Sequence, residues 1–184
     1  MVLSSSEGLE GFRPRARLDR PARIGRLVEP LAPGPVGLSD LSNVIVLDLP
    51  GGELASADMV SMLNGANRIA VRGDNGAWEV IGFQQASEIA PARWRLSGLL
   101  RALHGTEDAM ISEHSSDAQA VVLDETGRPL GLDVEGGGRL ANWIGDGVGE
   151  SQGEAGTLTL VGGGWAVSPV SPVEVCGVRG SGGD

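Results

Sequence analysis

The chain has 184 residues, which suits one large domain or two small ones. Its 30 glycines and 10 prolines disfavour long helices, because a glycine inside a helix costs about 1 kcal/mol and a proline about 3 kcal/mol. All 14 basic residues are arginine, and a formal net charge of −10 argues against general binding to phosphate backbones or to anionic lipid.

Short strands joined by turns are predicted along the first half of the chain. Pro14 and Pro21 exclude a helix near the N-terminus and favour edge strands there. Ser56 suits the N-cap of one short helix over residues 57–63, and the Gly-Asp-Asn-Gly sequence of residues 73–76 favours a hairpin turn. The strands predicted in this half cover residues 12–18, 22–29, 44–49, 67–72, 77–83 and 92–100.

The second half of the chain is acidic and rich in glycine. Residues 107–184 hold 13 of the 24 acidic residues but only 3 of the 14 arginines. The glycine-rich stretches at 136–138 and 145–156 are interpreted as exposed loops and not as cradles for a ligand. The strands predicted in this half cover residues 118–124, 139–144, 156–161 and 173–178.

Together these elements predict an all-β fold. It would be a small barrel or sandwich with one short helix, built either as one unit or as two β subdomains. The change of composition near residue 106 favours a boundary there. The predicted divisions are an N-terminal extended arm at 1–21, a β subdomain with the short helix at 22–106, an acidic glycine-rich β subdomain at 107–178 and a flexible tail at 179–184.

The four tryptophans are the best markers of the core. Trp94 and Leu96 share one face of the strand over 92–100 and are expected to point inward. We also expect Trp78 and Trp143 to be buried. Trp165 follows three glycines and is expected in an exposed loop, where a sugar ring would be able to stack on it.

Motifs for catalysis or metal binding are missing from the sequence. It holds no nucleophile elbow, phosphate-binding loop or zinc spacing, so we expect neither an enzyme nor a bound cofactor or metal. Cys176 is the single cysteine, which excludes an intramolecular disulfide and suits a buried, inert thiol. One polar cluster offers nitrogen and oxygen ligands in no fixed geometry, and we interpret it as a loop between subdomains; it comprises His104, Glu107, Asp108, Glu113 and His114.

Signals for export or membrane insertion are also missing. The first residues lack the basic and apolar regions of a secretory signal. No apolar run approaches the length of about 18 residues that a membrane-spanning helix needs. We therefore expect synthesis in the cytoplasm and no membrane span.

Arginines gather near the N-terminus, where Asp19 is the only acidic residue among them. Two interpretations remain open, a solvated strand face and a contact surface for an acidic partner chain. Arg13, Arg15 and Arg17 alternate along an extended stretch, so they should project to one face of a strand. The whole cluster comprises Arg13, Arg15, Arg17, Arg20, Arg23 and Arg26.

One stretch of the sequence resembles a known protein family. The string Trp94-Arg95-Leu96-Ser97-Gly98-Leu99-Leu100-Arg101, with Trp78 upstream and Gly105 downstream, is similar to a segment of tailed-phage tail proteins. It resembles in particular the large baseplate proteins of gene transfer agents in alphaproteobacteria, grouped as glycoside hydrolase/phage tail family proteins. Further pieces match in the family's order, so the resemblance extends over residues 15–178.

The resemblance implies a structural module of a virion, placed at the distal tail tip and synthesised in the bacterial cytoplasm. Its partners would be other tail-tip proteins (hub, baseplate and fibre proteins), with several copies per tail in a multiple of three. From the net charge and the missing motifs we expect no nucleic-acid partner and no cofactor. The matching residues would pack the fold, with Gly98 at a bulge, and they are Trp78, Trp94, Arg95, Leu96, Gly98, Leu99, Leu100, Arg101 and Gly105.

Glycan cleavage, which the family name suggests, is not expected here. The resembling proteins carry a glycosidase-like (β/α)₈ barrel elsewhere, and such a barrel needs about 250 residues of alternating strands and helices. We expect this chain to be the β-module made as a separate polypeptide that opens at Met1, with the flanking modules supplied by other chains. The alternative function is a receptor- or carbohydrate-binding module that contacts the host cell envelope and exposes aromatic side chains.

Overall fold

The computed structural model describes residues 2–5, 10–17, 20–124, 140–145 and 156–159. Within these residues the chain forms two compact units, a small sheet and a barrel. The barrel occupies Ala22–Asp124, and the strands of the small sheet come from the sequence on either side of it.

The small sheet contains four antiparallel strands. β1 (Val2–Ser5) pairs with β2 (Arg13–Ala16) and with β10 (Leu140–Gly145), and β10 pairs with β11 (Gly156–Thr159). The strand order is therefore β11-β10-β1-β2, which makes β2 an edge strand, as its proline suggests. The segment predicted as an extended arm thus contributes two sheet strands, because β1 pairs with a strand that lies far downstream in the sequence.

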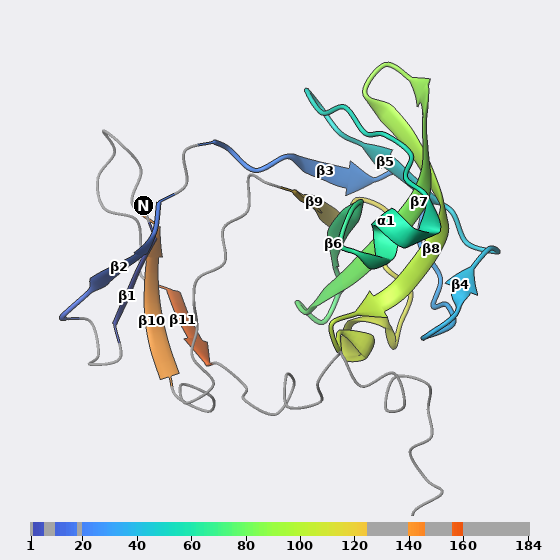
Figure 1. Ribbon diagram of the computed structural model, residues 1–184. Coiled ribbons are helices and arrows are strands. Elements are labelled where there is room, and N and C mark those ends of the chain that lie inside the picture. Colours follow the sequence, from blue (N-terminus) through green and yellow to red (C-terminus); the bar gives the residue numbers. More distant parts are fainter. Residues whose placement is uncertain (1, 6–9, 18–19, 125–139, 146–155, 160–184) are drawn as a thin grey trace, which may run out of the picture. The chain divides into compact units, whose positions relative to one another are not determined.

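Six strands of the second unit form a closed barrel (Figure 1), which confirms the prediction of a small all-β barrel. The neighbours follow the order β8-β5-β3-β9-β6-β7, and pairing of β7 with β8 closes the ring. A two-residue strand, β4 (Ser39–Asp40), extends beside β8. The barrel strands are β3 (Ile24–Leu27), β5 (Ile45–Asp48), β6 (Arg68–Arg72), β7 (Trp78–Ala90), β8 (Arg93–Leu103) and β9 (Gln119–Leu123).

The barrel extends past the boundary that composition suggested near residue 106. β9 lies between β3 and β6 and pairs with both of them, so the barrel does not close without it. A single turn of 3-10 helix, η1 (Glu107–Met110), leads from β8 toward β9. The change to an acidic composition after residue 106 therefore does not mark a boundary between structural units.

In the described part of the chain there is one α-helix, α1 (Met59–Leu63), and it is shorter than the predicted one. Its N-cap is Asp58, whose Oδ1 accepts a hydrogen bond from the Ser61 amide at 2.7 Å. Ser56, the predicted cap, instead accepts a hydrogen bond from the Ala86 amide at 3.0 Å. The hydroxyl therefore fastens the segment before the helix to the edge of β7.

The barrel interior is filled by apolar side chains, as expected for a ring of this size. Leu47, Ile69, Ile81 and Leu96 are each 0% exposed. Trp94 is 8% exposed, so the predicted inward face of β8 is confirmed.

The expected burial of Trp78 is wrong. Trp78 is 36% exposed at the start of β7, whereas Glu79, Ile81 and Phe83 are at most 1% exposed. The odd-numbered positions of this stretch face the core, and the first of these positions is occupied by the carboxylate residue Glu79. Trp143, on β10 of the small sheet, is half-buried and not fully buried as expected.

Gly98 marks a change of inward face along β8. Leu96 and Leu99 are both 0% exposed, so the inward positions pass from even to odd numbers across Gly98, whose φ is +65°. The shift in β7–β8 register occurs later, because Gly82 pairs with Leu100 while Val80 pairs with Leu103. The change of inward face expected at Gly98 is therefore present. The bulge, which is one extra residue in β8 relative to β7, lies after Leu100.

Replacing Gly25 with alanine should destabilise the barrel by about 1–3 kcal/mol, the usual cost of overpacking. A Cβ atom at Gly25 would collide with the backbone carbonyl oxygen of Asp48, on the neighbouring strand β5. A backbone atom cannot rotate away as a side chain can, so β3 and β5 must separate. Urea denaturation of the variant checks this expectation, and an unchanged unfolding midpoint would contradict it.

Candidate partner surface and buried charge network

The six clustered arginines are divided between the two units. Arg13 and Arg15 lie on β2, Arg17 follows it directly, and all three are exposed. Leu3 pairs with Pro14 while Val2 pairs with Ala16, so Arg15 is an extra residue in β2. This extra residue interrupts the regular alternation on which the expected one-face arrangement of the three arginines depends.

Arg23 belongs to the barrel and is neutralised within it. Its guanidinium forms an ion pair with Asp124, with Nε donating to Oδ2 at 2.7 Å, and its Nη1 donates to the Glu53 carbonyl oxygen at 2.6 Å. The Val122 amide also donates to the Arg23 carbonyl oxygen at 3.0 Å. These contacts join the start of the barrel segment to its end. The guanidinium of Arg23 therefore holds the barrel together and is less suited to binding a partner.

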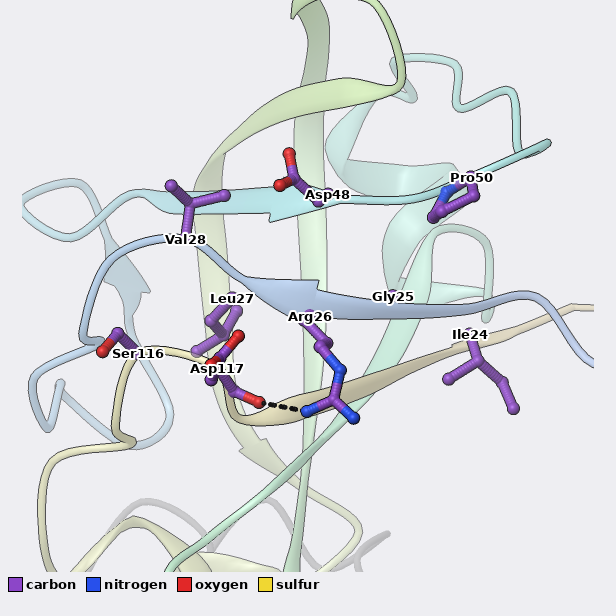
Figure 2. A pocket seen from close by; sticks show the side chains of 9 residues that line it. All are labelled: Ile24, Gly25, Arg26, Leu27, Val28, Asp48, Pro50, Ser116 and Asp117. Atoms are coloured by element: carbon purple, nitrogen blue, oxygen red, sulfur yellow. Dashed lines mark hydrogen bonds between the residues drawn. The ribbon is translucent and has the colours of Figure 1, made fainter.

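Arg26 lines an open hollow of about 470 Å³ beside β3 (Figure 2). Its Nη1 donates to the Asp117 carbonyl oxygen at 3.1 Å. Asp48, on β5, also lines the hollow and forms a two-point ion pair with Arg93 at 2.7 and 2.8 Å. The hollow is therefore lined by one exposed arginine and by two aspartates, of which Asp48 already has a cationic partner. This chemistry suits a polar side chain of a partner.

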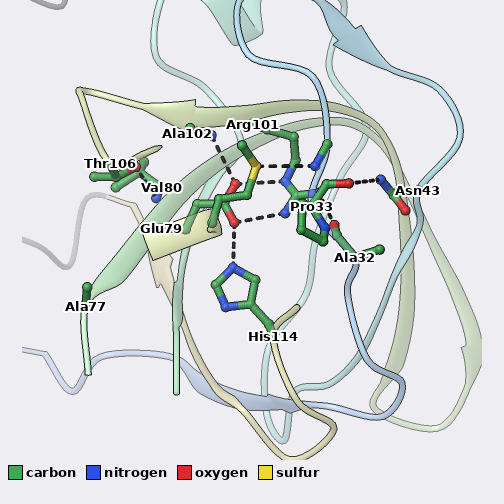
Figure 3. A network of polar contacts seen from close by, with 12 residues as sticks. Ala32, Pro33, Asn43, Ala77, Glu79, Val80, Arg101, Ala102, Thr106 and His114 are labelled. Carbon is green, nitrogen blue, oxygen red and sulfur yellow. Dashed lines mark hydrogen bonds and ion pairs between the residues drawn. The ribbon is translucent and has the colours of Figure 1, made fainter. Parts of the chain in front are cut away.

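A cluster of polar side chains is buried in the barrel unit (Figure 3). This cluster was not predicted from the sequence. Four charged or titratable side chains there are at most 2% exposed: Asp40, Glu79, Arg101 and His114. Arg101 and Glu79 form a two-point ion pair, Nε to Oε1 at 2.8 Å and Nη2 to Oε2 at 2.9 Å. Arg101 Nη1 also donates to the Ala32 carbonyl oxygen at 2.8 Å and to Asp40 Oδ2 at 3.3 Å.

Glu79 is the centre of this buried charge network. Its Oε1 also accepts the Ala102 amide at 3.0 Å, and its Oε2 lies 2.6 Å from His114 Nε2, which acts as the donor to the ionised carboxylate. Burial alone would raise the pKa of Glu79, but the hydrogen bonds from His114 and Arg101 and the charge of Arg101 outweigh it. The net pKa is lowered, so Glu79 is held as a carboxylate.

Asp40 is held as a carboxylate in a similar way. Its Oδ1 accepts the amides of Ser42 at 3.1 Å and Asn43 at 3.0 Å, and its Oδ2 accepts Asn43 Nδ2 at 2.7 Å. Burial acts to raise the pKa of Asp40, but these hydrogen bonds, with that from Arg101, lower it overall. Arg101 is thus flanked by two carboxylates.

Local backbone features bring the network together. The change of face at Gly98 turns Arg101 inward, and Ala102, with a φ of +52°, directs its amide to Glu79. His114 is positioned by two backbone hydrogen bonds with Leu31, each 2.9 Å long. The network therefore connects segments far apart in the sequence, and since each of its carboxylates already has a cationic partner, it serves structure better than catalysis.

Acid should destabilise the barrel through these two carboxyls. Both pKa values are lowered in the folded state from ordinary values of 4.5 for Glu79 and 3.8 for Asp40. The unfolded chain therefore binds protons more tightly, and their stabilisation is present above the ordinary values and lost as the pH falls toward the lowered ones. Urea denaturation between about pH 7 and about pH 3 should show this loss, with a flatter profile in Glu79→Gln. Equal slopes for the two proteins would contradict the assignment.

The residues of the family resemblance occupy different environments. Trp94, Leu96, Leu99 and Arg101 are buried in the barrel. Leu100 is half-buried, and Arg95 and Gly105 are exposed, the last with a φ of +73° in the turn after β8. Only Arg101 among the charged motif residues enters the buried network.

The polar cluster that we interpreted as a loop is dispersed. Glu107 and Asp108 lie on η1, Glu113 is exposed, and His114 is buried against Glu79. Among the described residues, no three His, Cys, Asp or Glu side chains come together in a way that would hold a metal ion. Cys176 and Trp165 lie outside the described residues.

One signal in the sequence pointed to the network. Glu79 has the same strand parity as Ile81 and Phe83, so the inward face of those residues includes a carboxylate. A buried carboxylate requires a cation, and Arg101 belongs to the other strand of the same hairpin. Asp40 and His114 had no comparable signal. Asp40 lies on the two-residue strand β4, which is too short to show an alternating pattern, and His114 lies in the connection between η1 and β9.

Comparison with known proteins places the barrel in a family. The family model described as Rcc01698-like, C-terminal, matches residues 22–121, which is nearly the whole barrel unit. The match covers more than half of the chain, and the chain belongs to this family. No curated protein matches the sequence significantly. None of the helices in the described part of the chain is long and apolar enough to span a bilayer.

Proposed function

We propose that this member of the Rcc01698-like, C-terminal family is a structural component of a phage-like tail tip or baseplate. It would dock onto hub or fibre-bearing tail proteins in a siphovirus or a particle similar to a gene transfer agent. The observation that carries the proposal is the family match over the barrel, together with the resemblance of the Trp94–Arg101 string to tail proteins. The chain would be synthesised in the bacterial cytoplasm and would act at the distal tail tip.

The construction of the barrel supports a scaffolding role. Its interior is filled by apolar side chains and by the buried charge network, which leaves the outer surface and the small sheet for contacts with partners. Paired charges inside a closed barrel favour a single rigid arrangement. A component of a particle needs such rigidity, because its surfaces must match several neighbours at once.

The exposed arginines of the small sheet are the proposed docking surface. Arg13, Arg15 and Arg17 lie on or beside the edge strand β2, and guanidinium groups suit pairing with carboxylates of an acidic partner chain. Each rim pair contributes about 0.2–1 kcal/mol, so several must act together and salt should weaken them. Copies in a multiple of three per tail would repeat this contact around the tip.

Incorporation into particles tests the docking surface. Particles from the strain that carries the gene should contain the wild-type chain, whereas the Arg13→Glu/Arg15→Glu/Arg17→Glu variant should be depleted from them. The matched control reverses two exposed arginines of the barrel, Arg72 and Arg95, and should be incorporated normally. Immunoblots of gradient-purified particles and of total lysate measure the ratio. Wild-type occupancy of the triple variant would refute the docking surface.

On this proposal the chain has no hydrolytic activity of its own. The expected result is no clearing by the purified chain in a peptidoglycan zymogram and no turnover of simple glycosides above a buffer control. Activity that is abolished by changing a single carboxylate would overturn the assignment.

One observation favours the second candidate, a receptor- or carbohydrate-binding module. Trp78 is 36% exposed, and its cross-strand neighbour is the exposed Arg72. An exposed aromatic ring beside a polar side chain is able to stack on a sugar. Binding of the chain to host envelope glycans, lost in Trp78→Ala, would support this function, and undiminished binding by that variant would exclude Trp78 as the site.

A further inference from the structure

A half-buried arginine of the barrel has no partner among the described residues. Arg68 opens β6, where it pairs with Gly82 of β7 and Leu123 of β9. Ile69 and Val71 point into the barrel, so Arg68 lies on the outer face of β6. Its Nε atom is buried, yet it makes no hydrogen bond within the described part of the chain.

Other arginines of the barrel that are partly or fully buried have carboxylate partners. Arg101 pairs with Glu79, and Arg23 pairs with Asp124. A guanidinium that leaves water without an anion loses hydration and gains nothing in return. Burial and the positive charge of Arg68 lower the pKa of His104.

Arg68 lines a hollow of about 330 Å³ on the barrel surface. The other side-chain donors of the hollow are already engaged. Arg23 is bound to Asp124, and Asn67 Nδ2 donates to the Ala55 carbonyl oxygen at 2.7 Å. The guanidinium of Arg68 is therefore the donor group that remains for a ligand in this hollow.

The rest of the hollow is shaped by a glycine and by apolar side chains. A Cβ atom at Gly65 would lie 3.4 Å from Arg68 Nη2, so the guanidinium packs directly against this residue. The φ of Gly65 is +106°, a conformation that favours glycine. Leu54, Ala66 and the partly exposed Leu123 supply apolar walls.

We propose that this hollow binds a carboxylate carried on an apolar group, with Arg68 as the partner of the anion. A carboxylate matches the planar guanidinium through two parallel hydrogen bonds. Glu53 and Asp124 also line the hollow, and their charges oppose a phosphate dianion more strongly than a single carboxylate. The C-terminus of a peptide and the side chain of an internal glutamate both carry this chemistry. The inference is independent of the tail-tip proposal.

Nuclear magnetic resonance on the full chain tests the site, with hexanoate as the probe. Hexanoate should cause saturable shifts of the Arg68 Nε–Hε signal and of the amides of Gly65 and Ala66, whereas hexylamine should not. Arg68→Gln should weaken binding by at least about tenfold, since a charge-assisted hydrogen bond is lost. Arg68→Lys keeps the charge but not the planar fork and should also bind more weakly. The matched control, Arg72→Gln, changes an exposed arginine at the other end of β6 and should bind normally.

Two peptides identify the source of the carboxylate. A peptide that ends in a free leucine carboxylate tests the C-terminal source, and a peptide with capped ends and one internal glutamate tests the side-chain source. The tighter binder in the same titration identifies the natural class of ligand. Equal hexanoate binding by the parent chain and Arg68→Gln would overturn the proposal. So would phosphate shifts equal to those of hexanoate at both Arg68 and Arg72, which would show only charge screening.

Discussion

Replacing Glu79 with glutamine should destabilise the barrel by about 3–5 kcal/mol, the usual effect of removing one partner from a buried ion pair. Glu79 is 0% exposed and accepts hydrogen bonds from Arg101, Ala102 and His114. Glutamine keeps the shape but removes the negative charge. Arg101 would then remain buried with only the 3.3 Å contact to Asp40 to balance it.

Urea denaturation measures this effect, and two further variants make the result specific. Asp48→Asn removes the carboxylate of an exposed ion pair, with side chains 46% and 42% exposed, and should leave the urea midpoint nearly unchanged. The double variant Glu79→Gln/Arg101→Met should be less destabilised than the sum of the two single variants, because it removes both charges. Strict additivity would mean that the two side chains do not act as a pair.

Truncating Trp94 to alanine should cost about 3–5 kcal/mol of folding free energy, which is a large part of the stability of a domain. Trp94 is 8% exposed and belongs to the apolar core of the barrel, beside Leu96 and Leu47. Its removal leaves a cavity that the closed ring of strands cannot easily collapse to fill.

Trp78→Ala is the matched comparison, since Trp78 is the other barrel tryptophan and is 36% exposed. Its expected cost is below about 1.5 kcal/mol, because truncation of a partly exposed side chain leaves no enclosed cavity. Thermal unfolding followed by circular dichroism measures both variants. Similar losses of melting temperature would show that Trp94 does not occupy the core as described.

Much of the barrel was predictable from local patterns in the sequence. Strands around β5, β6, β8 and β9 follow from apolar runs, and the hairpin turn follows from Gly73 to Gly76. The order of the strands was not predictable, because pairing of β9 with β3 and β6 depends on contacts between distant segments. The boundary suggested by the change of composition near residue 106 was wrong, because β9 lies after that point and completes the barrel through these distant pairings.

The candidate sites were less predictable than the fold. The N-terminal arginines stand out in the sequence, but only three-dimensional contacts show that Arg23 is tied to Asp124. Glu79 and Arg101 were separately visible as charges in apolar strands. Asp40 reaches Arg101 from the two-residue strand β4, and His114 reaches Glu79 from a connection, and neither segment shows such a pattern. Arg68 gave no signal, because its lack of a partner depends on what surrounds its side chain.

A cryo-electron microscopy reconstruction of the tail tip of purified particles tests the central proposal most directly. The proposal predicts density at the distal tip that fits the closed barrel of β3 and β5–β9, repeated in a multiple of three, with acidic side chains of a neighbouring chain facing Arg13, Arg15 and Arg17. A tip fully accounted for by other chains, with this protein present in the lysate and absent from the particles, would contradict it.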